Sequence, residues 1–141
     1  MSNDEALAVC ESLVRAGSVM SRGVEAGLGH VSGLGFTDLM IMRRLAEAEV
    51  PPRRVDLAER MGMTASGVTR ALVPLEKVGL VDRARDQRDA RASRASLTDV
   101  GQERLGDATL AATEQARRLL TARLDEAEIA ELGRILAKLN S

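Results

Sequence analysis

The stretch at residues 64–78, TASGVTRALVPLEKV, constrains the fold of this chain more than any other. Its large apolar residues recur at steps of four and three, at Val68, Leu72 and Leu75. This spacing places them along one face of a helix, and such a face is typically buried. The opposite face carries short polar residues and one Arg, so it can approach another surface closely. Thr64 is a typical N-cap and Gly79 suits the left-handed position that ends a helix.

A shorter helical stretch at residues 54–61 comes just before it and leads through Gly62 into residues 64–78. A short helix, a tight turn that contains glycine and a second helix with a polar outer face form the helix-turn-helix pattern. Pro74 is an irregularity in the second helix. It removes the backbone bond to the carbonyl of Arg70 and should bend the axis.

Two short strand candidates follow, at residues 80–85 and 92–97. The polar segment between them, DQRDAR, predicts the tip of a hairpin. A two-stranded ribbon directly after a helix-turn-helix pair is a wing. Its tip holds two cations and two carboxylates: Arg88, Arg91, Asp86 and Asp89. An acidic neighbour can hold an Arg side chain extended, so we expect both Asp residues to orient the wing.

Helices are also predicted on both sides of this unit. Apolar residues recur at helical spacing in four further stretches: residues 4–28, 37–48, 98–123 and 125–139. Thr98 is a typical N-cap, and Asp125 forms a capping box with Glu128. The first of these helices is too long to bury its apolar stripe within so small a chain. We therefore expect it to need a partner surface.

Composition excludes several classes of protein. The chain has no run of about 18 apolar residues, so we expect no membrane span. Its acidic N-terminus does not resemble a signal peptide, and its single Cys gives no intrachain disulfide, which together favour the cytoplasm. The absence of Trp and Tyr argues against a platform that stacks RNA or single-stranded bases. No nucleophile–base pair, phosphate-binding Gly loop or metal-ligand cluster points to an enzyme or a cofactor.

The net charge of −1 conceals an asymmetry along the chain. Residues 53–94 hold ten Lys and Arg against six Asp and Glu, whereas the remainder holds ten against fifteen. A basic centre between acidic ends favours a segment that faces phosphate groups. Ordinary solvated charge is the alternative interpretation.

Three segments carry a resemblance to a known family: VDLAERMGMTASGVTRALVPLEKVGLVDR, DQRDAR and LTDVGQERL. Over residues 36–105 the chain resembles the MarR-type winged helix-turn-helix regulators. The resemblance implies a mainly α fold with a small β-wing, six helices and a two- to three-stranded sheet. It also implies a homodimer whose N- and C-terminal helices interlock. Residues 1–35 and 106–141 would form the dimerisation region, and residues 36–105 the DNA-binding domain.

The resemblance further implies a transcriptional regulator of double-stranded DNA, usually a ligand-responsive repressor on a pseudo-palindromic operator. Many family members release DNA when a small, often aromatic acid binds between the dimer and DNA-binding regions. Three residues of the expected pocket walls favour an apolar or adaptable cavity, or no cavity at all: Met20, Met40 and Met42. Activation in place of repression would use the same contact surface.

Residues 64–78 are our candidate for the helix that enters the major groove. Ser66, Thr69 and Arg70 are the candidates for base and phosphate contact. Arg70 could hold a guanine through two hydrogen bonds, worth about 1–3 kcal/mol of discrimination. The alternative for Arg70 is contact with a phosphate or with an acidic neighbour.

The wing and the flanking cations supply the other expected contacts. By the family pattern Arg91, with Arg88, would lie near the minor groove, whose negative potential attracts Arg. Family members often carry a second Arg beside the one at Arg91. Here that position is Ala90, so either the wing grips less firmly or Arg88 substitutes. Three further residues are candidates for phosphate contact, with solvated charge as the alternative: Arg53, Arg54 and Lys77.

Cys10 and His30 are the only Cys and the only His of the chain, and each could carry chemistry of its own. Some family members sense peroxides through a first-helix cysteine, so a Cys10-based redox-sensing repressor is an alternative. Because Cys10 lies on an apolar stripe and the chain has no Tyr to stabilise a thiolate, we expect a buried, inert side chain. His30 stands alone, so we expect no metal site. The rival function is a winged-helix dimer that binds another protein and not DNA.

Overall fold

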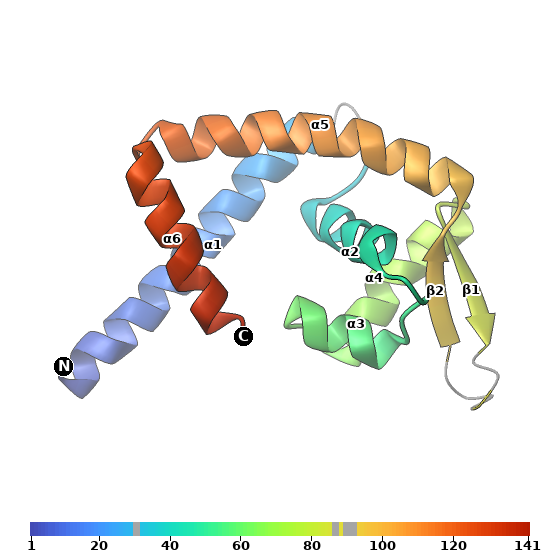
Figure 1. Ribbon diagram of the computed structural model, residues 1–141, viewed down its shortest axis with the longest axis horizontal. Coiled ribbons are helices and arrows are strands. Elements are labelled where there is room, and N and C mark those ends of the chain that lie inside the picture. The colour runs from blue at the N-terminus through green and yellow to red at the C-terminus, as the bar shows by residue number, and fades with distance from the viewer. Residues whose placement is uncertain (30–31, 86–87, 89–92) are drawn as a thin grey trace.

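The computed structural model describes residues 1–29, 32–85, 88 and 93–141, and within them it contains six helices and two strands (Figure 1). In chain order these are α1 (Asn3–Leu28), α2 (Phe36–Glu47), α3 (Arg54–Met61), α4 (Ala65–Lys77), β1 (Val81–Arg85), β2 (Ser93–Leu97), α5 (Asp99–Thr121) and α6 (Glu126–Leu139). The fold is mainly helical with a small β-wing, which confirms the predicted class.

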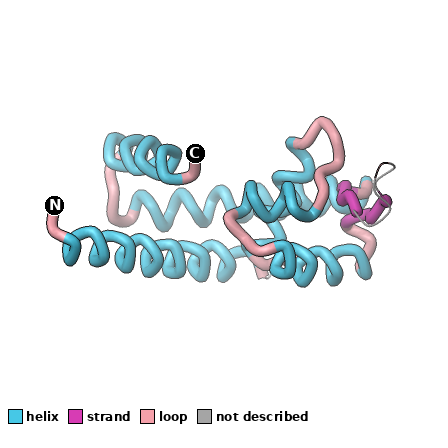
Figure 2. Tube along the Cα trace, turned by 90° about the horizontal axis from the view of Figure 1, so that it is seen from below, coloured by secondary structure: helices cyan, strands magenta, loops and turns pink. Residues whose placement is uncertain are grey.

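Helix α5 runs along most of the length of the molecule (Figure 1). At one end it packs beside α2 and β2, and further along it packs against α1. The strands lie at the end of the molecule away from the N-terminus, in both views (Figures 1 and 2). The long helix therefore joins a compact winged unit to a region made of α1 and α6.

The winged unit has a continuous apolar core. The largest of its fully buried side chains come from α2, α3 and α4: Leu39, Ile41, Met42, Leu57, Val68 and Leu72. Strands β1 and β2 pair antiparallel, with Val81 opposite Leu97 and Arg85 opposite Ser93. A single bridge between Arg53 and Arg94 adds the segment before α3 to the edge of β2. The sheet is thus two-stranded with one further bridge, within the predicted range of two to three strands.

The turn chemistry explains why the helices of this unit begin and end where they do. The Thr64 hydroxyl accepts a hydrogen bond from the Gly67 N–H at 3.0 Å and so caps α4. Gly62 and Gly79 follow α3 and α4 with φ of +61° and +78°, a region that L side chains rarely adopt. The predicted N-cap and the predicted left-handed glycine are both confirmed. Helix α4 continues through Pro74 to Lys77.

The joint between α4 and α5 is unusually close. The Thr98 hydroxyl donates to the Gly79 carbonyl at 2.6 Å and accepts from the Gly101 N–H at 2.9 Å. A Cβ atom at Gly101 would lie 2.0 Å from the Leu80 carbonyl oxygen, far inside van der Waals contact. Only glycine therefore allows the first turn of α5 to lie directly on the chain that enters β1.

The terminal helices are poorly covered by the rest of the chain. In α1 only Val24 and Leu28 are buried, and none of the residues of α6, all of which the structure describes, is buried. The expected burial of Cys10 is wrong for the single chain, because Cys10 is exposed. Among the residues that the structure describes, none buries the half of α1 that carries it. Among the described residues, no helix is both long enough and apolar enough to cross a membrane.

Candidate nucleic-acid interface

Helix α4 presents two different faces. Val68, Leu72 and Leu75 are buried, with exposed fractions of 0 %, 0 % and 3 %. On the outer face Ser66 and Arg70 are exposed and Thr69 is half-buried. The predicted stripe is thus the buried one, and two of the three residues proposed for base and phosphate contact are exposed. The third, Thr69, lies at the border between the faces.

Two further cations lie near the ends of the helix-turn-helix. Lys77 is exposed in the last turn of α4. Arg53 is the N-cap residue of α3, and its guanidinium donates to Asp56 at 3.2 Å from both Nε and Nη2. This side-chain hydrogen bond is the largest cause that lowers the pKa of Asp56, and burial acts in the opposite direction. Asp56 therefore stays ionised and holds the Arg53 side chain at the surface.

Arg54 is held in the fold by two side chains. Its Nη2 lies 3.1 Å from Oε1 of Glu76 on α4, and its Nε donates to the Ser93 hydroxyl on β2 at 3.0 Å. The Arg54 and Glu76 side chains retain only 16 % and 20 % of their exposure. Arg54 was predicted as a candidate for phosphate contact, but its guanidinium already binds protein groups. The ion pair with Glu76 was not predicted, because 22 residues separate the partners and neither stands out in the local pattern.

Only one of the predicted wing residues falls within the described part of the chain. Arg88 is exposed, whereas Asp86, Asp89, Ala90 and Arg91 lie outside the described residues, as does His30. At the base of the wing, the Arg94 Nη1 donates to the Pro51 carbonyl at 2.7 Å, and the Ala95 N–H donates to the Pro52 carbonyl at 3.1 Å. These bonds attach β2 to the segment before α3. The base of the wing is thus fixed to the helix-turn-helix.

A pocket of about 240 Å³ lies where α1, α2 and α5 meet. It is lined by Val24, Phe36, Leu39, Arg43, Thr109, Ala112, Thr113 and Ala116. None of the three Met residues expected there is in this set. Met42 is fully buried in the core of the winged unit. The pocket has an apolar floor, two hydroxyl groups and one cation at its edge.

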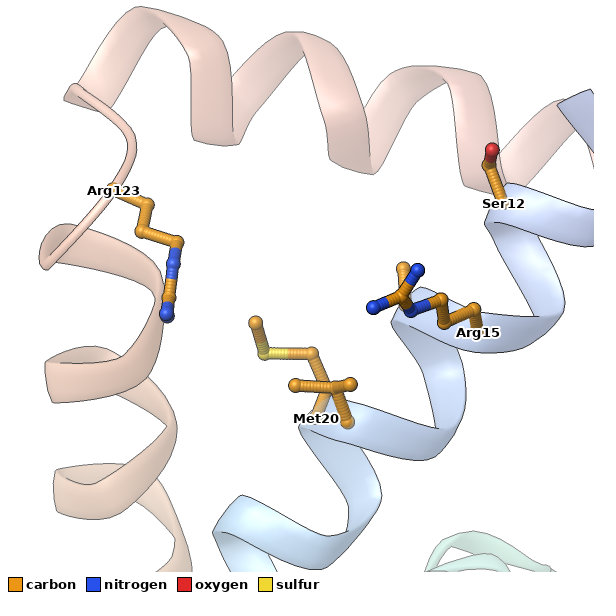
Figure 3. Close-up of a pocket in the computed structure, with 6 residues that line it drawn as sticks. Ser12, Arg15, Met20 and Arg123 are labelled. Atoms are coloured by element: carbon orange, nitrogen blue, oxygen red, sulfur yellow. The ribbon is translucent and has the colours of Figure 1, made fainter.

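A second hollow of about 320 Å³ lies between α1 and the corner where α5 turns into α6. Figure 3 shows Arg15 and Met20 on α1 and Arg123 across from them, around one open space. The remaining lining residues are Ser12, Ala16 and Val19. Met20, one of the expected pocket residues, is found here. Among the residues that the structure describes, no cluster of His, Cys, Asp or Glu could hold a metal ion.

Comparison with known proteins shows what this arrangement is similar to. A family model described as the MarR family matches residues 32–92, which cover the helix-turn-helix and most of the wing. The chain is similar to a MarR family transcriptional regulator from Streptomyces coelicolor, solved in complex with DNA, with 26% identity and a TM-score of 0.83. That alignment covers 99% of this chain and 88% of the other. No curated protein matches the chain.

Two further solved structures have the same fold. The transcriptional regulator BldR from Sulfolobus solfataricus is 28% identical with a TM-score of 0.81, over 98% of this chain and 99% of that chain. CouR from Rhodococcus jostii, solved with p-coumaroyl-CoA, is 20% identical with a TM-score of 0.78, over 94% of this chain and 91% of the other. The similarity to CouR is a similarity of fold. All three alignments include the terminal helices as well as the winged unit.

Proposed function

We propose that the chain is a winged-helix regulator of the MarR type, a homodimeric, ligand-responsive repressor that binds a pseudo-palindromic operator. The family-model match over residues 32–92 and the similar regulators that are 26% and 28% identical support this proposal. The observation that carries this proposal is the outer face of α4, where Ser66 and Arg70 are exposed while the apolar stripe is buried. A helix of this kind fits the major groove of duplex DNA. The similar Streptomyces regulator was solved with DNA. DNA binding in turn implies the cytoplasm as the place of action.

The side chains of the helix-turn-helix divide between bases and phosphates in this proposal. Arg70, Ser66 and Thr69 lie toward the groove and read base edges, with Arg70 as the main determinant. Lys77 and Arg53 lie at the helix ends, where the phosphate strands pass, and they set the register of the protein on the duplex. Arg53 is pre-oriented for that contact because Asp56 already holds its guanidinium.

The wing supplies the second contact. We assign Arg88 and Arg91 to the minor groove or its flanking phosphates, with Asp86 and Asp89 orienting them. The base of the wing supports this role, because Arg94 and the backbone of β2 are bonded to the segment before α3. Because β2 is held in this way, the base of the wing keeps a fixed distance from α4, as a two-groove contact requires.

A second copy of the chain is the proposed partner of the terminal helices. Helix α6 exposes Leu132, Ile135 and Leu139, and the first half of α1 exposes Leu7 and Val14, with exposed fractions between 37 % and 70 %. Apolar surface on this scale, on the two terminal helices, marks an interaction surface. A symmetric pair would bury it and would present two α4 helices, one helical turn of DNA apart, to the same face of a duplex. Residues 1–35 and 106–141 would then be the dimerisation region, and residues 36–105 the DNA-binding domain.

The pocket between α1, α2 and α5 is the proposed ligand site. Phe36 and the aliphatic side chains of its floor suit a ring or a short apolar chain, and Arg43 with Thr109 and Thr113 suits a carboxylate. Its walls come from both regions of the molecule. The dimerisation region and the DNA-binding domain can differ in their relative placement. A small aromatic or aliphatic acid that binds more tightly to one placement would shift the protein toward it, and so change its affinity for DNA. CouR, which has the same fold, was solved with an aromatic acyl-CoA.

Selection from a pool of random duplexes tests the proposal without knowledge of the operator. We expect the pool to converge on two inverted half-sites about one helical turn apart, about 10 bp. Fluorescence anisotropy should then show that the selected duplex binds more tightly than a scrambled one, with an affinity that falls steeply as salt rises. If no sequence is enriched, the proposal that this chain binds DNA sequence-specifically is wrong. A winged-helix dimer that binds another protein then explains the fold better. Arylcarboxylates are then added to the complex of the protein with the selected duplex. A fall in anisotropy, which reports release of the duplex, is the result expected if the pocket is a ligand site.

A further inference from the structure

The first turn of α3 carries a charge pattern that the helix itself does not favour. Arg53 and Arg54 both lie at its N-terminal end, where the helix dipole is positive and cations are disfavoured. Arg53 is compensated within its own helix by Asp56. Arg54 finds its compensation outside α3. Its place at this position is therefore explained by what it contacts elsewhere in the fold.

Those contacts join three elements at one guanidinium. Arg54 belongs to α3, Glu76 to the last turn of α4, and Ser93 is the first residue of β2. Ser93 is 9 % exposed, and the two charged side chains are also largely shielded from solvent. A planar guanidinium that bonds two groups through different nitrogens fixes the angle between them as well as their distance. A Lys at this position would place a single charged ammonium near Glu76 but would lack the planar set of donors that fixes the angle.

The last turn of α4 is the part of that helix that most needs an external contact. Pro74 has no N–H, so the backbone bond that would join it to the Arg70 carbonyl is missing. Glu76 lies two residues beyond this gap. Its ion pair with Arg54 ties the turn after Pro74 to α3 and, through Ser93, to the wing.

We propose that Arg54 is a positioning residue for DNA recognition, which sets the placement of α4 relative to the wing by binding Glu76 and Ser93 at once. The inference rests on the proposed function, because it concerns how two elements meet one duplex. The base-reading face of α4 and the wing hairpin must enter neighbouring grooves together. Arg54 would thus contribute to specificity without touching DNA.

Anisotropy titrations of the full-length protein distinguish a positioning role of Arg54 from direct contact between Arg54 and a DNA phosphate. The probes are a duplex selected from a random pool by the unaltered protein and a scrambled duplex of the same length. We expect Arg54→Met and Glu76→Gln each to weaken binding of the selected duplex about tenfold. The double variant should bind no more weakly than either single variant, because both substitutions break the same contact. Binding of the scrambled duplex and the salt slope should stay unchanged. Arg54→Lys should restore only part of the affinity.

The opposite pattern would overturn the proposal. If Arg54 binds phosphate, Arg54→Met weakens both duplexes equally and reduces the salt slope by about one. Glu76→Gln would then strengthen binding, because it frees the guanidinium and removes a negative charge. Lys77→Met, next to Glu76 but without this contact, serves as the reference for a pure phosphate effect.

Hydrogen exchange on the protein without DNA gives an independent readout. Glu76→Gln should speed amide exchange in β2 as well as in the last turn of α4, because both depend on the same guanidinium. Unchanged exchange in β2 would refute the link between the elements. If the unaltered protein selects no duplex, the proposed function fails, while the exchange data still decide whether Arg54 joins α4 to the wing.

Discussion

Gly101 gives the sharpest test of how the long helix meets the wing. It lies in the first turn of α5, is buried, and approaches the chain that enters β1. A Cβ at this position would lie 2.0 Å from the Leu80 carbonyl oxygen and 3.0 Å from the Leu80 carbonyl carbon. The obstacle is backbone, so no side-chain rotation relieves it. Gly101→Ala therefore has to push α5 and β1 apart by about 1 Å or more.

Two opposing effects set the expected size of the change. Alanine stabilises a helix by about 0.5–1 kcal/mol relative to glycine. Overpacking of a tight contact costs about 1–3 kcal/mol, and more where backbone has to move. The displacement also strains the bond between the Thr98 N–H and the Leu80 carbonyl, now 3.1 Å long and worth about 1 kcal/mol. We expect a net loss of about 2 kcal/mol, or about 5–10 °C in Tm for a chain of this size.

Gly106→Ala is the matched control on the same helix. A Cβ there meets nothing within 4 Å, so only the helix preference remains. Its Tm should rise by about 2–4 °C. Circular dichroism melts of the three proteins, at one fixed protomer concentration, give the comparison. If Gly101→Ala raises Tm as Gly106→Ala does, α5 does not lie on Leu80 as described.

The remaining predictions concern the partner, the bases and the pH. Leu132→Asp places a charge on the apolar face of α6, so it should convert the dimer to a monomer in sedimentation and abolish tight operator binding. A dimer that persists would exclude α6 from the interface. Arg70→Ala should lower the preference for the selected duplex over a scrambled one, while Lys77→Ala should weaken both alike, and titration of both duplexes distinguishes the two roles. The pKa of Asp56 is lowered by its hydrogen bond from Arg53, so its contribution to stability is present above the unfolded pKa of about 3.9 and is lost as pH falls through the lowered value. Acid titration of stability should therefore be flatter below about pH 4 in Asp56→Asn than in the unaltered protein, and identical curves would show that the pair contributes nothing.

Local patterns predicted much of the winged unit, because its elements are defined by short-range chemistry. The spacing of Val68, Leu72 and Leu75 predicted the buried face of α4, and the structure buries these residues. Thr64 and Gly79 predicted its ends, since capping and left-handed turns depend on neighbouring residues alone. These features could be identified without any knowledge of tertiary contacts.

Long-range contacts could not be predicted in the same way. The pairing of Arg54 with Glu76 and Ser93 brings together residues 22 and 39 positions apart, and a surface cation in the sequence looks the same whether or not it is paired. The error at Cys10 has a related origin. A helical stripe shows that a face will be covered but not by what, and in the single chain Cys10 on this stripe is exposed.

The central claim is that two copies of the chain place two α4 helices in successive major grooves of one duplex. Hydroxyl-radical and methylation footprints of the selected duplex, taken with the stoichiometry of the complex from sedimentation, test it most directly. We expect two protomers per duplex and two protected major-groove segments related by two-fold symmetry, with centres about 10 bp apart. One protomer per duplex, or a single protected segment, would contradict it.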